Sequence, residues 1–138
     1  MKDTASAAGV KPSRLIVALD VLAFSAAERL IAELSPLADG FAIGYMAMAA
    51  GWDRRAIELI RSTGGRESII FSDPHLNATP RITAAAVRAY AGWGITHLSI
   101  CGTAGEAAIR AAVENRGPVS IVVTTVLTSF DENDIRCE

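Results

Sequence analysis

The chain contains only two cysteines, Cys101 and Cys137, and they do not form a CxxC pair. Two cysteines are too few for a disulfide framework, and their spacing does not suit a metal site. We therefore expect both to be ordinary thiols.

Long hydrophobic runs and an excess of positive charge are also missing. The longest apolar run, Phe41 to Trp52, covers about a dozen residues and includes glycine, whereas a membrane span needs ~20. Thirteen Lys and Arg residues against fifteen Asp and Glu give a net charge of −2, so no basic surface is expected for nucleic acid. Met1 to Lys11 lacks the features of a secretory signal, so we expect a cytoplasmic protein with no nucleic-acid or membrane partner.

The composition is that of a globular domain, with 51% hydrophobic and 20% charged residues in 138. Short β-branched or aliphatic runs alternate with longer alanine-rich amphipathic runs, and the short runs recur about every 25 residues. This interval fits one strand, one helix and two loops. The predicted strands are Leu15–Leu19, Phe41–Gly44, Ser68–Phe71, His97–Cys101 and Ser120–Val126.

Helices are predicted between these strands. Ser25 and Glu28 have the spacing of a capping box, which predicts a first helix over residues 26–34. Asp53 is expected to cap a second helix that ends at about Ser62. Further helices are expected from Pro80 to Gly92 and from Gly105 to Asn115. Four crossovers between five apolar strands predict a parallel sheet in an α/β fold.

Five parallel strands fit either an open doubly wound sheet or part of a (β/α)8 barrel. Open nucleotide-binding sheets usually carry a glycine-rich turn after the first strand, and residues 20–25 contain no glycine. This absence favours a partial TIM-type barrel of about five βα units, whose functional side chains lie at the carboxyl ends of the strands.

Acidic and basic residues occur at those expected strand ends. Asp20 follows the first strand, and Asp73 and His75 follow the third. An aspartate there is often only a helix cap or a loop hydrogen bonder. Because residues two apart in an extended segment project to the same side, Asp73 can instead orient His75 for acid/base chemistry.

The segments Leu15–Asp20, Ala38–Tyr45, Ile70–Asp73 and Val123–Ser129 together resemble successive strands of orotidine 5′-phosphate decarboxylase. The segment His97–Gly102 resembles the fourth strand of that family. The resemblance implies a (β/α)8 barrel that acts as a cofactor-free lyase in pyrimidine nucleotide (UMP) biosynthesis. It implies a phosphorylated pyrimidine nucleotide as ligand.

The resemblance also implies roles for individual residues. Asp20 matches the aspartate that contacts the ribose, and Ser129 matches the serine that contacts the pyrimidine ring. Asp73 matches the first aspartate of the family's catalytic Lys–Asp–Lys–Asp array. The three other positions of the array hold Ala42, His75 in place of the proton-donating lysine, and Ala78 in place of an aspartate contributed across a dimer interface.

The length predicts only part of a barrel, since a complete one needs roughly 200 residues or more. We expect residues 1–13 to be a flexible segment and residues 14–138 to form the N-terminal part of a decarboxylase-like barrel. The family's phosphate-binding loops follow strands seven and eight, which lie beyond the sequence. A truncated product, a half-barrel that assembles with a second copy or a complementing chain, and a sheet that closes differently all fit this length.

Three functions stay open on the sequence. The first is a lyase of the decarboxylase family, with Asp73 and His75 as catalytic residues and Asp20 and Ser129 as substrate-binding residues. The second is an inactive remnant that binds a nucleotide or packs against another chain. The third is a different reaction on the same scaffold, in which His75 is the general base.

Overall fold

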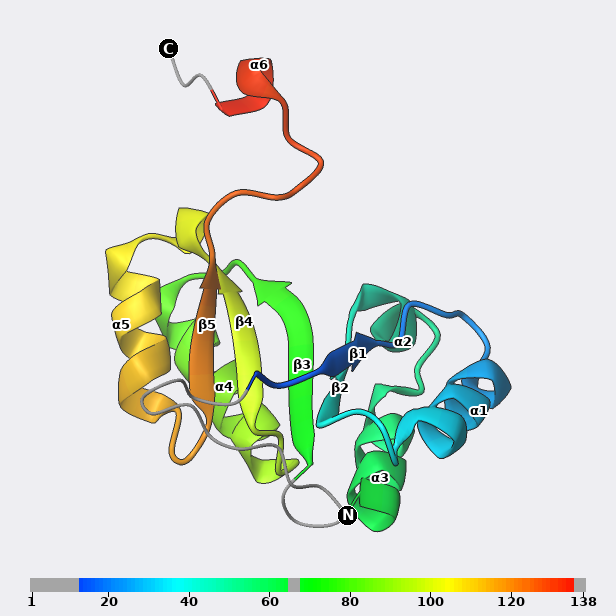
Figure 1. Ribbon diagram of the computed structural model, residues 1–138. Coiled ribbons are helices and arrows are strands. Elements are labelled where there is room, and N and C mark those ends of the chain that lie inside the picture. The colour runs from blue at the N-terminus through cyan, green and yellow to red at the C-terminus, as the bar shows by residue number, and fades with distance from the viewer. Residues whose placement is uncertain (1–12, 65–67, 136–138) are drawn as a thin grey trace, which may run out of the picture.

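The computed structural model of the chain describes residues 13–64 and 68–135. Apart from Ser13, the predicted flexible segment lies outside these residues, as does Cys137. Five strands form one sheet (Figure 1). They are β1 (Ile16–Ala18), β2 (Gly40–Ile43), β3 (Ile69–Leu76), β4 (His97–Cys101) and β5 (Ser120–Thr124).

The strands are all parallel and lie side by side in their order along the chain. A doubly wound sheet reverses direction at a switch point, and this sheet does not. Because right-handed crossovers that always advance in one direction put every helix on the same face, the other face is left free of crossover helices. The prediction of a partial (β/α) barrel is therefore confirmed.

The helices follow the predicted alternation. α1 (Phe24–Leu34) and α3 (Asp53–Gly64) pack together over one half of the sheet, and α4 (Pro80–Gly92) packs against α5 (Glu106–Asn115) over the other. Three short helices were not predicted. They are α2 (Tyr45–Ala49), η1 (Gly102–Ala104) and α6 (Glu132–Ile135).

The predicted capping box at Ser25 is wrong. α1 begins at Phe24, its N-cap is Ala23, and no side chain caps it. The Phe24 ring lies 5.9 Å from the ring of Trp52, centroid to centroid, and the Arg55 guanidinium stacks on it. The helix therefore starts one residue before Ser25, at Phe24, whose ring packs against Trp52 and Arg55.

Asp53 is likewise not an N-cap, because it is the first residue of α3 itself. The backbone N–H of Ala56 donates to the carbonyl oxygen of Trp52, so the helical bonding pattern starts at Trp52. Asp53 lies in the first turn, where a negative charge interacts favourably with the helix dipole.

The hydrophobic core lies between the sheet and the helices. Strand residues alternate, so those that face the helices are buried while their neighbours face the opposite side. Phe41, Ile70 and Leu98 are buried strand residues, and Ile31 and Ile60 meet them from the helices. Among the described residues, no helix is both long and apolar enough to cross a membrane.

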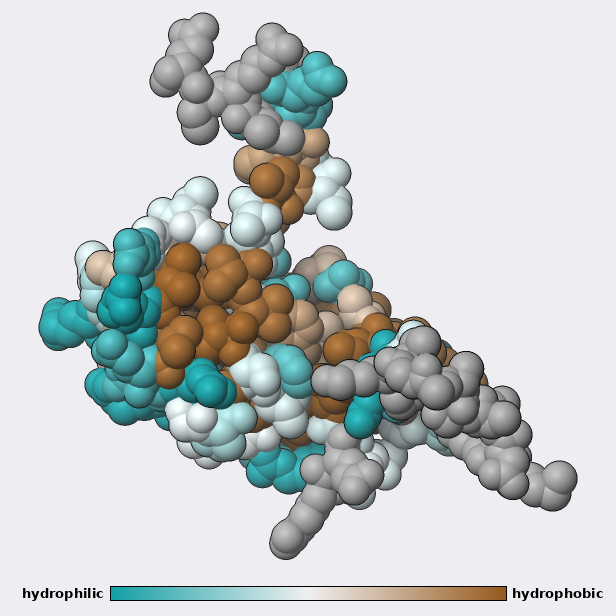
Figure 2. Space-filling model, turned by 60° about the vertical axis from the view of Figure 1, so that its left-hand side comes forward, coloured by the Kyte–Doolittle hydropathy of each residue, from teal (hydrophilic) through white to brown (hydrophobic). Residues whose placement is uncertain are grey.

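One flank of the fold is apolar and open. Figure 2 shows a continuous hydrophobic area next to the charged outer side of α5. Within the described part of the chain, β5 pairs only with β4, and Val122 and Val123 are 38% and 39% exposed. Val113 on α5 is 49% exposed. We call Ile109, Val113, Val122 and Val123 the β5–α5 surface.

Candidate functional site

The face of the sheet opposite the helices carries three of the four predicted site residues, Asp20, Asp73 and His75. Strand pairing places one row of residues side by side across all five strands on this inner face, namely Ala18, Ala42, Phe71, His97 and Ser120. Two residues further along β1 and β3, the alternation brings Asp20 and Asp73 to the same face. Two acidic groups that are far apart in the sequence therefore lie on the same face, at the carboxyl ends of β1 and β3, with β2 between them.

Asp20 lies beside the end of β2. The backbone N–H of Leu19 donates to the carbonyl oxygen of Ala42 over 2.9 Å, which extends the pairing of β1 with β2 beyond the strand itself. A Cβ atom at Gly44 would lie 3.4 Å from Oδ1 of Asp20. The small residue at position 44 therefore leaves the Asp20 carboxylate uncovered on this side.

Asp73 and His75 lie within β3, which is longer than predicted and continues to Leu76. The Nε2 atom of His75 is 3.6 Å from Oδ2 of Asp73, and the two side chains are 26% and 29% exposed. The expected pairing of these two side chains is thus found in the structure. Both remain accessible to a small molecule.

His75 also contacts three other elements. Its Nδ1 atom is 3.1 Å from Oγ1 of Thr124 on β5, and its backbone N–H donates to Oγ of Ser99 on β4 over 2.8 Å. The ring of Tyr45 in α2 stacks over the imidazole with a centroid distance of 6.1 Å. Cys101 donates its S–H to the His75 carbonyl oxygen over 3.3 Å.

The sequence did not single out Ser99 or Thr124 as site residues. A hydroxyl inside the apolar run His97–Cys101 is a weak signal for Ser99, because a buried polar group needs a hydrogen-bond partner. Thr124 gives no such signal, since a β-branched threonine is an ordinary strand residue. Its contact with His75 depends on the pairing of three strands.

The other predicted positions lie apart from this pair. Ser129 is exposed in the segment that follows β5, and this segment leads away from the sheet toward α6 (Figure 1). Ala42 lies on the inner face opposite Phe71. Ala78 lies between β3 and α4, where its carbonyl oxygen accepts a hydrogen bond from the buried Thr83.

Two titratable groups near the sheet have shifted pKa values. Burial lowers the pKa of the His97 imidazole, which favours its neutral form. Burial raises the pKa of the Tyr90 hydroxyl, and the negative charge of Asp53 raises it further.

Within residues 13–64 and 68–135, no group of three or more His, Cys, Asp or Glu side chains could hold a metal ion. Asp20, Asp73 and His75 present two carboxylates and an imidazole, which are groups that can exchange protons and form hydrogen bonds.

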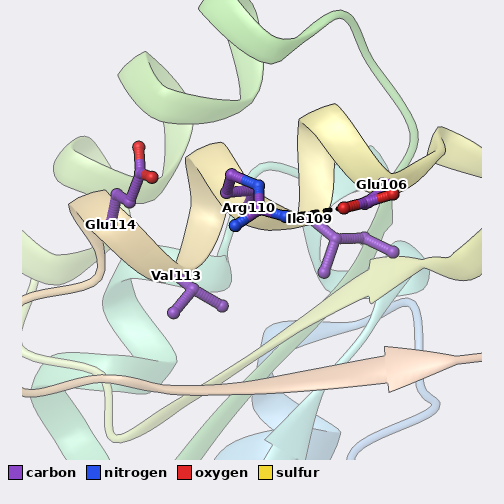
Figure 3. Close-up of a pocket in the computed structure, with 5 residues that line it drawn as sticks. All are labelled: Glu106, Ile109, Arg110, Val113 and Glu114. Atoms are coloured by element: carbon purple, nitrogen blue, oxygen red, sulfur yellow. Dashed lines mark hydrogen bonds and ion pairs between the residues drawn. The ribbon is translucent and has the colours of Figure 1, made fainter.

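A groove lies elsewhere, along α5 (Figure 3). Ile109 and Val113 project from one side of this helix, and the Arg110 guanidinium pairs with the Glu106 carboxylate over 2.6 Å beside them. This groove adjoins the β5–α5 surface, and Asp73 and His75 do not line it.

A parallel sheet in sequential strand order, with acidic and basic side chains at the strand ends, defines the class of (β/α)-barrel proteins. The sequence profile of the orotidine 5′-phosphate decarboxylase / HUMPS family matches residues 13–138. The chain belongs to this family.

Curated relatives agree with this assignment. Orotidine 5′-phosphate decarboxylase of Moorella thermoacetica is 34% identical over 134 residues, which cover 91% of this chain and 52% of the relative. The enzyme of Methylorubrum extorquens is 38% identical over 122 residues, covering 88% of this chain and 50% of the relative. The chain thus spans about half the length of these relatives.

Solved structures show the same fold. Orotidine 5′-monophosphate decarboxylase of Methanocaldococcus jannaschii, in complex with the inhibitor BMP, superimposes with a TM-score of 0.70 at 17% identity, covering 80% of this chain and 50% of that one. An uncharacterised conserved protein of Geobacillus kaustophilus gives a TM-score of 0.74 at 21% identity, covering 86% and 57%. The five strand–helix units correspond to about half of each solved chain.

Proposed function

We propose that this chain forms five strand–helix units of an orotidine 5′-phosphate decarboxylase-type barrel, and that its strand ends bind a phosphorylated pyrimidine nucleotide. The observation that carries the proposal is the approach of Asp73 to His75, 3.6 Å apart at the carboxyl end of β3. Membership of the family supports a nucleotide as ligand. Asp20 contributes a second carboxylate on the same face.

The roles of the four candidate residues follow from the family resemblance. Asp20 binds the ribose and Ser129 the pyrimidine ring, while Asp73 and His75 occupy positions that belong to the catalytic array in the family. Ser129 contacts the ring only if its exposed segment approaches the strand ends. Nucleotide binding therefore includes a movement of the residues that follow β5 toward the strand ends.

The family's own decarboxylation is not expected from this chain. Ala42 and Ala78 carry methyl groups, which cannot donate a proton or hold a charge. The side chain of His75 is shorter than that of the lysine it replaces. Because the chemistry depends on preorganised charges, loss of three of the four leaves a binding site without this electrostatic catalysis.

A thermal-shift titration tests the binding. Uridine 5′-monophosphate and a barbiturate nucleotide are added to the full chain, and turnover of orotidine 5′-phosphate is measured in parallel. A ligand that binds only the folded chain raises its stability by RT ln(1 + [L]/Kd), about 2.7 kcal/mol at 100 times Kd. We expect a rise in the melting temperature without turnover.

Matched variants locate the binding. Asp20→Asn and Asp73→Asn should each reduce the nucleotide-induced shift, while Glu114→Gln on the exposed side of α5 should leave it unchanged. No shift with either nucleotide would refute the binding proposal. Turnover would refute the proposed loss of decarboxylation.

The β5–α5 surface favours a second candidate function, assembly with another chain. An unpaired strand edge next to exposed apolar side chains is a typical interaction surface. The partner with the fitting chemistry is a parallel strand followed by an amphipathic helix, as in the remaining units of a family barrel. A second copy of this chain is the other partner to test.

Complementation tests this candidate. A separately produced chain that carries strands six to eight of the Moorella thermoacetica relative is mixed with this chain, and the mixture is analysed by gel filtration. Co-elution that Val113→Lys abolishes would support assembly through the β5–α5 surface. A wild-type chain that elutes alone would refute a complementing chain, and a dimer of the chain by itself would identify the second copy as partner.

A further inference from the structure

The strand β3 contains an irregularity at the candidate site. Ser72 pairs with Leu98 and Leu76 pairs with Ile100, so Asp73, Pro74 and His75 of β3 lie opposite a single residue of β4. His75 has a φ of 46°, which lies in the left-handed region. Residues other than glycine seldom adopt this conformation and keep it only where their surroundings enforce it.

Side chains of β4 hold the backbone of His75 in this conformation. Ser99 accepts the His75 N–H over 2.8 Å, and the S–H of Cys101 donates to the His75 carbonyl oxygen over 3.3 Å. Ser99 is completely buried. Two side chains on the same face of β4 thus replace the backbone hydrogen bonds that a regular ladder would supply to His75.

Each nitrogen of the His75 ring has a polar neighbour, but only Nδ1 is within hydrogen-bond distance of it. Nδ1 lies 3.1 Å from the Thr124 hydroxyl, and Nε2 lies 3.6 Å from Oδ2 of Asp73. Because 3.6 Å is longer than a direct hydrogen bond, a third polar atom can bond to both groups. The partial exposure of both side chains leaves room for that atom to belong to a ligand.

Backbone geometry alone does not account for a histidine here. Glycine would adopt the same φ without strain. The backbone conformation at position 75 therefore favours glycine over histidine. Contacts from β4 and β5 converge on this one residue. Such convergence is what preorganisation of a functional group requires.

We propose that Ser99 and Thr124 are positioning residues that hold His75, so that Nε2 and the Asp73 carboxylate together bind one protic group of the ligand. Ser99 acts through the backbone of His75, and Thr124 acts through its ring. This inference rests on the proposed function only in placing the ligand at the ends of the strands.

Imidazole NMR tests the positioning without any nucleotide. The chain has two histidines, so a His97→Gln variant leaves His75 as the single source of imidazole signals. Long-range proton–nitrogen spectra report which ring nitrogen carries the proton. We expect one fixed tautomer, which Thr124→Val converts to a mixture and Thr124→Ser retains.

Chemical reactivity gives a second measurement for Ser99. Modification of His75 by diethyl pyrocarbonate is followed by peptide mass spectrometry, with His97 as internal reference. Ser99→Ala should raise the relative rate for His75 several-fold, and Ser99→Thr, which keeps the hydroxyl, should restore the slow rate. If the Ser99 variants do not fold, the Thr124 pair and the wild-type spectrum still decide the question.

The possible outcomes separate this inference from the proposed function. A wild-type His75 with averaged tautomers, or Thr124 variants that behave alike, would overturn the positioning role whatever the nucleotide does. A fixed tautomer together with no thermal shift by uridine 5′-monophosphate would support the positioning of His75 and refute a pyrimidine nucleotide as the ligand. A nucleotide shift that Thr124→Val weakens and Thr124→Ser preserves would support both.

Discussion

The indole N–H of Trp52 donates a hydrogen bond to the carbonyl oxygen of Leu22 over 2.8 Å. This bond ties the segment between β1 and α1, which begins beside Asp20, to the start of α3. Trp52 is only 3% exposed. The position of the segment that follows Asp20 therefore depends on the buried side chain of Trp52.

Replacing Trp52 by phenylalanine should destabilise the chain. The variant keeps an aromatic ring but leaves the Leu22 carbonyl without its donor, so we expect the free energy of unfolding to fall by about 1–2 kcal/mol. Urea denaturation measures this change. Trp93→Phe is the matched control, because Trp93 is only partly buried, and an equal loss in both variants would contradict the role of the Leu22 bond.

A second prediction concerns the close approach of β2 and β3. A Cβ atom at Gly40 would collide with the carbonyl oxygen of Ile69, whereas one at Gly92 meets nothing within 4 Å. Gly40→Ala should therefore cost about 3 kcal/mol or prevent folding, while Gly92→Ala at the end of α4 should be neutral or slightly stabilising. The melting temperatures of the two variants test this prediction. Equal values would contradict the close approach of β2 and β3 at Gly40.

Periodicity predicted the elements of this fold better than it predicted their ends. The alternation of strands and helices is a local property, and β4 and α4 occur where it places them. β3 is five residues longer at its carboxyl end than predicted, because Asp73, Pro74 and His75 have the composition of a loop. Their place in the sheet depends on side chains of β4, which local sequence does not report.

The same distinction applies to the site. Asp73 and His75 are two residues apart, so the sequence alone keeps them close, although their side chains meet within the irregularity of β3 and not in a regular strand. Ser99 and Thr124 reach His75 from 24 and 49 residues away in the chain. Their contacts require the register of β3, β4 and β5 together, which hydrophobic patterning does not specify.

A third prediction tests the backbone conformation of His75. Its φ of 46° suits glycine and strains alanine. His75→Gly should therefore be more stable than His75→Ala by about 1 kcal/mol, although glycine is usually the less stable of the two in a strand. Chemical denaturation of both variants measures the difference, and an alanine variant at least as stable as the glycine variant would contradict the left-handed geometry.

A fourth prediction concerns pH. Burial lowers the pKa of His97 below its ordinary value of 6.5, so the unfolded chain takes up this proton at a higher pH than the folded chain does. The neutral, partly buried His97 therefore contributes fully to the free energy of unfolding above pH 6.5. This contribution declines as the pH falls below 6.5 and stays constant below the pKa of His97 in the folded chain.

The His97→Gln variant isolates this contribution. Its stability should decline less than that of the wild type as the pH falls below 6.5, with the two curves parallel above that value. Urea midpoints at a series of pH values measure both curves. If the curves stay parallel below pH 6.5 as well, burial of His97 does not affect the pH dependence.

The last prediction concerns self-association through the β5–α5 surface. Val113 is 49% exposed at the groove along α5, and Ile82 is 47% exposed on α4, outside this surface. A lysine at position 113 places a charge where a strand–helix unit would pack, and edge charges oppose such pairing.

Val113→Lys should therefore reduce concentration-dependent association in sedimentation experiments, whereas Ile82→Lys, which removes a side chain of similar exposure, should not. Because both positions lie on the exposed sides of helices, neither change should lower the melting temperature by more than a few degrees. An equal effect of the two variants would mean that general hydrophobicity governs association, and not the edge of β5.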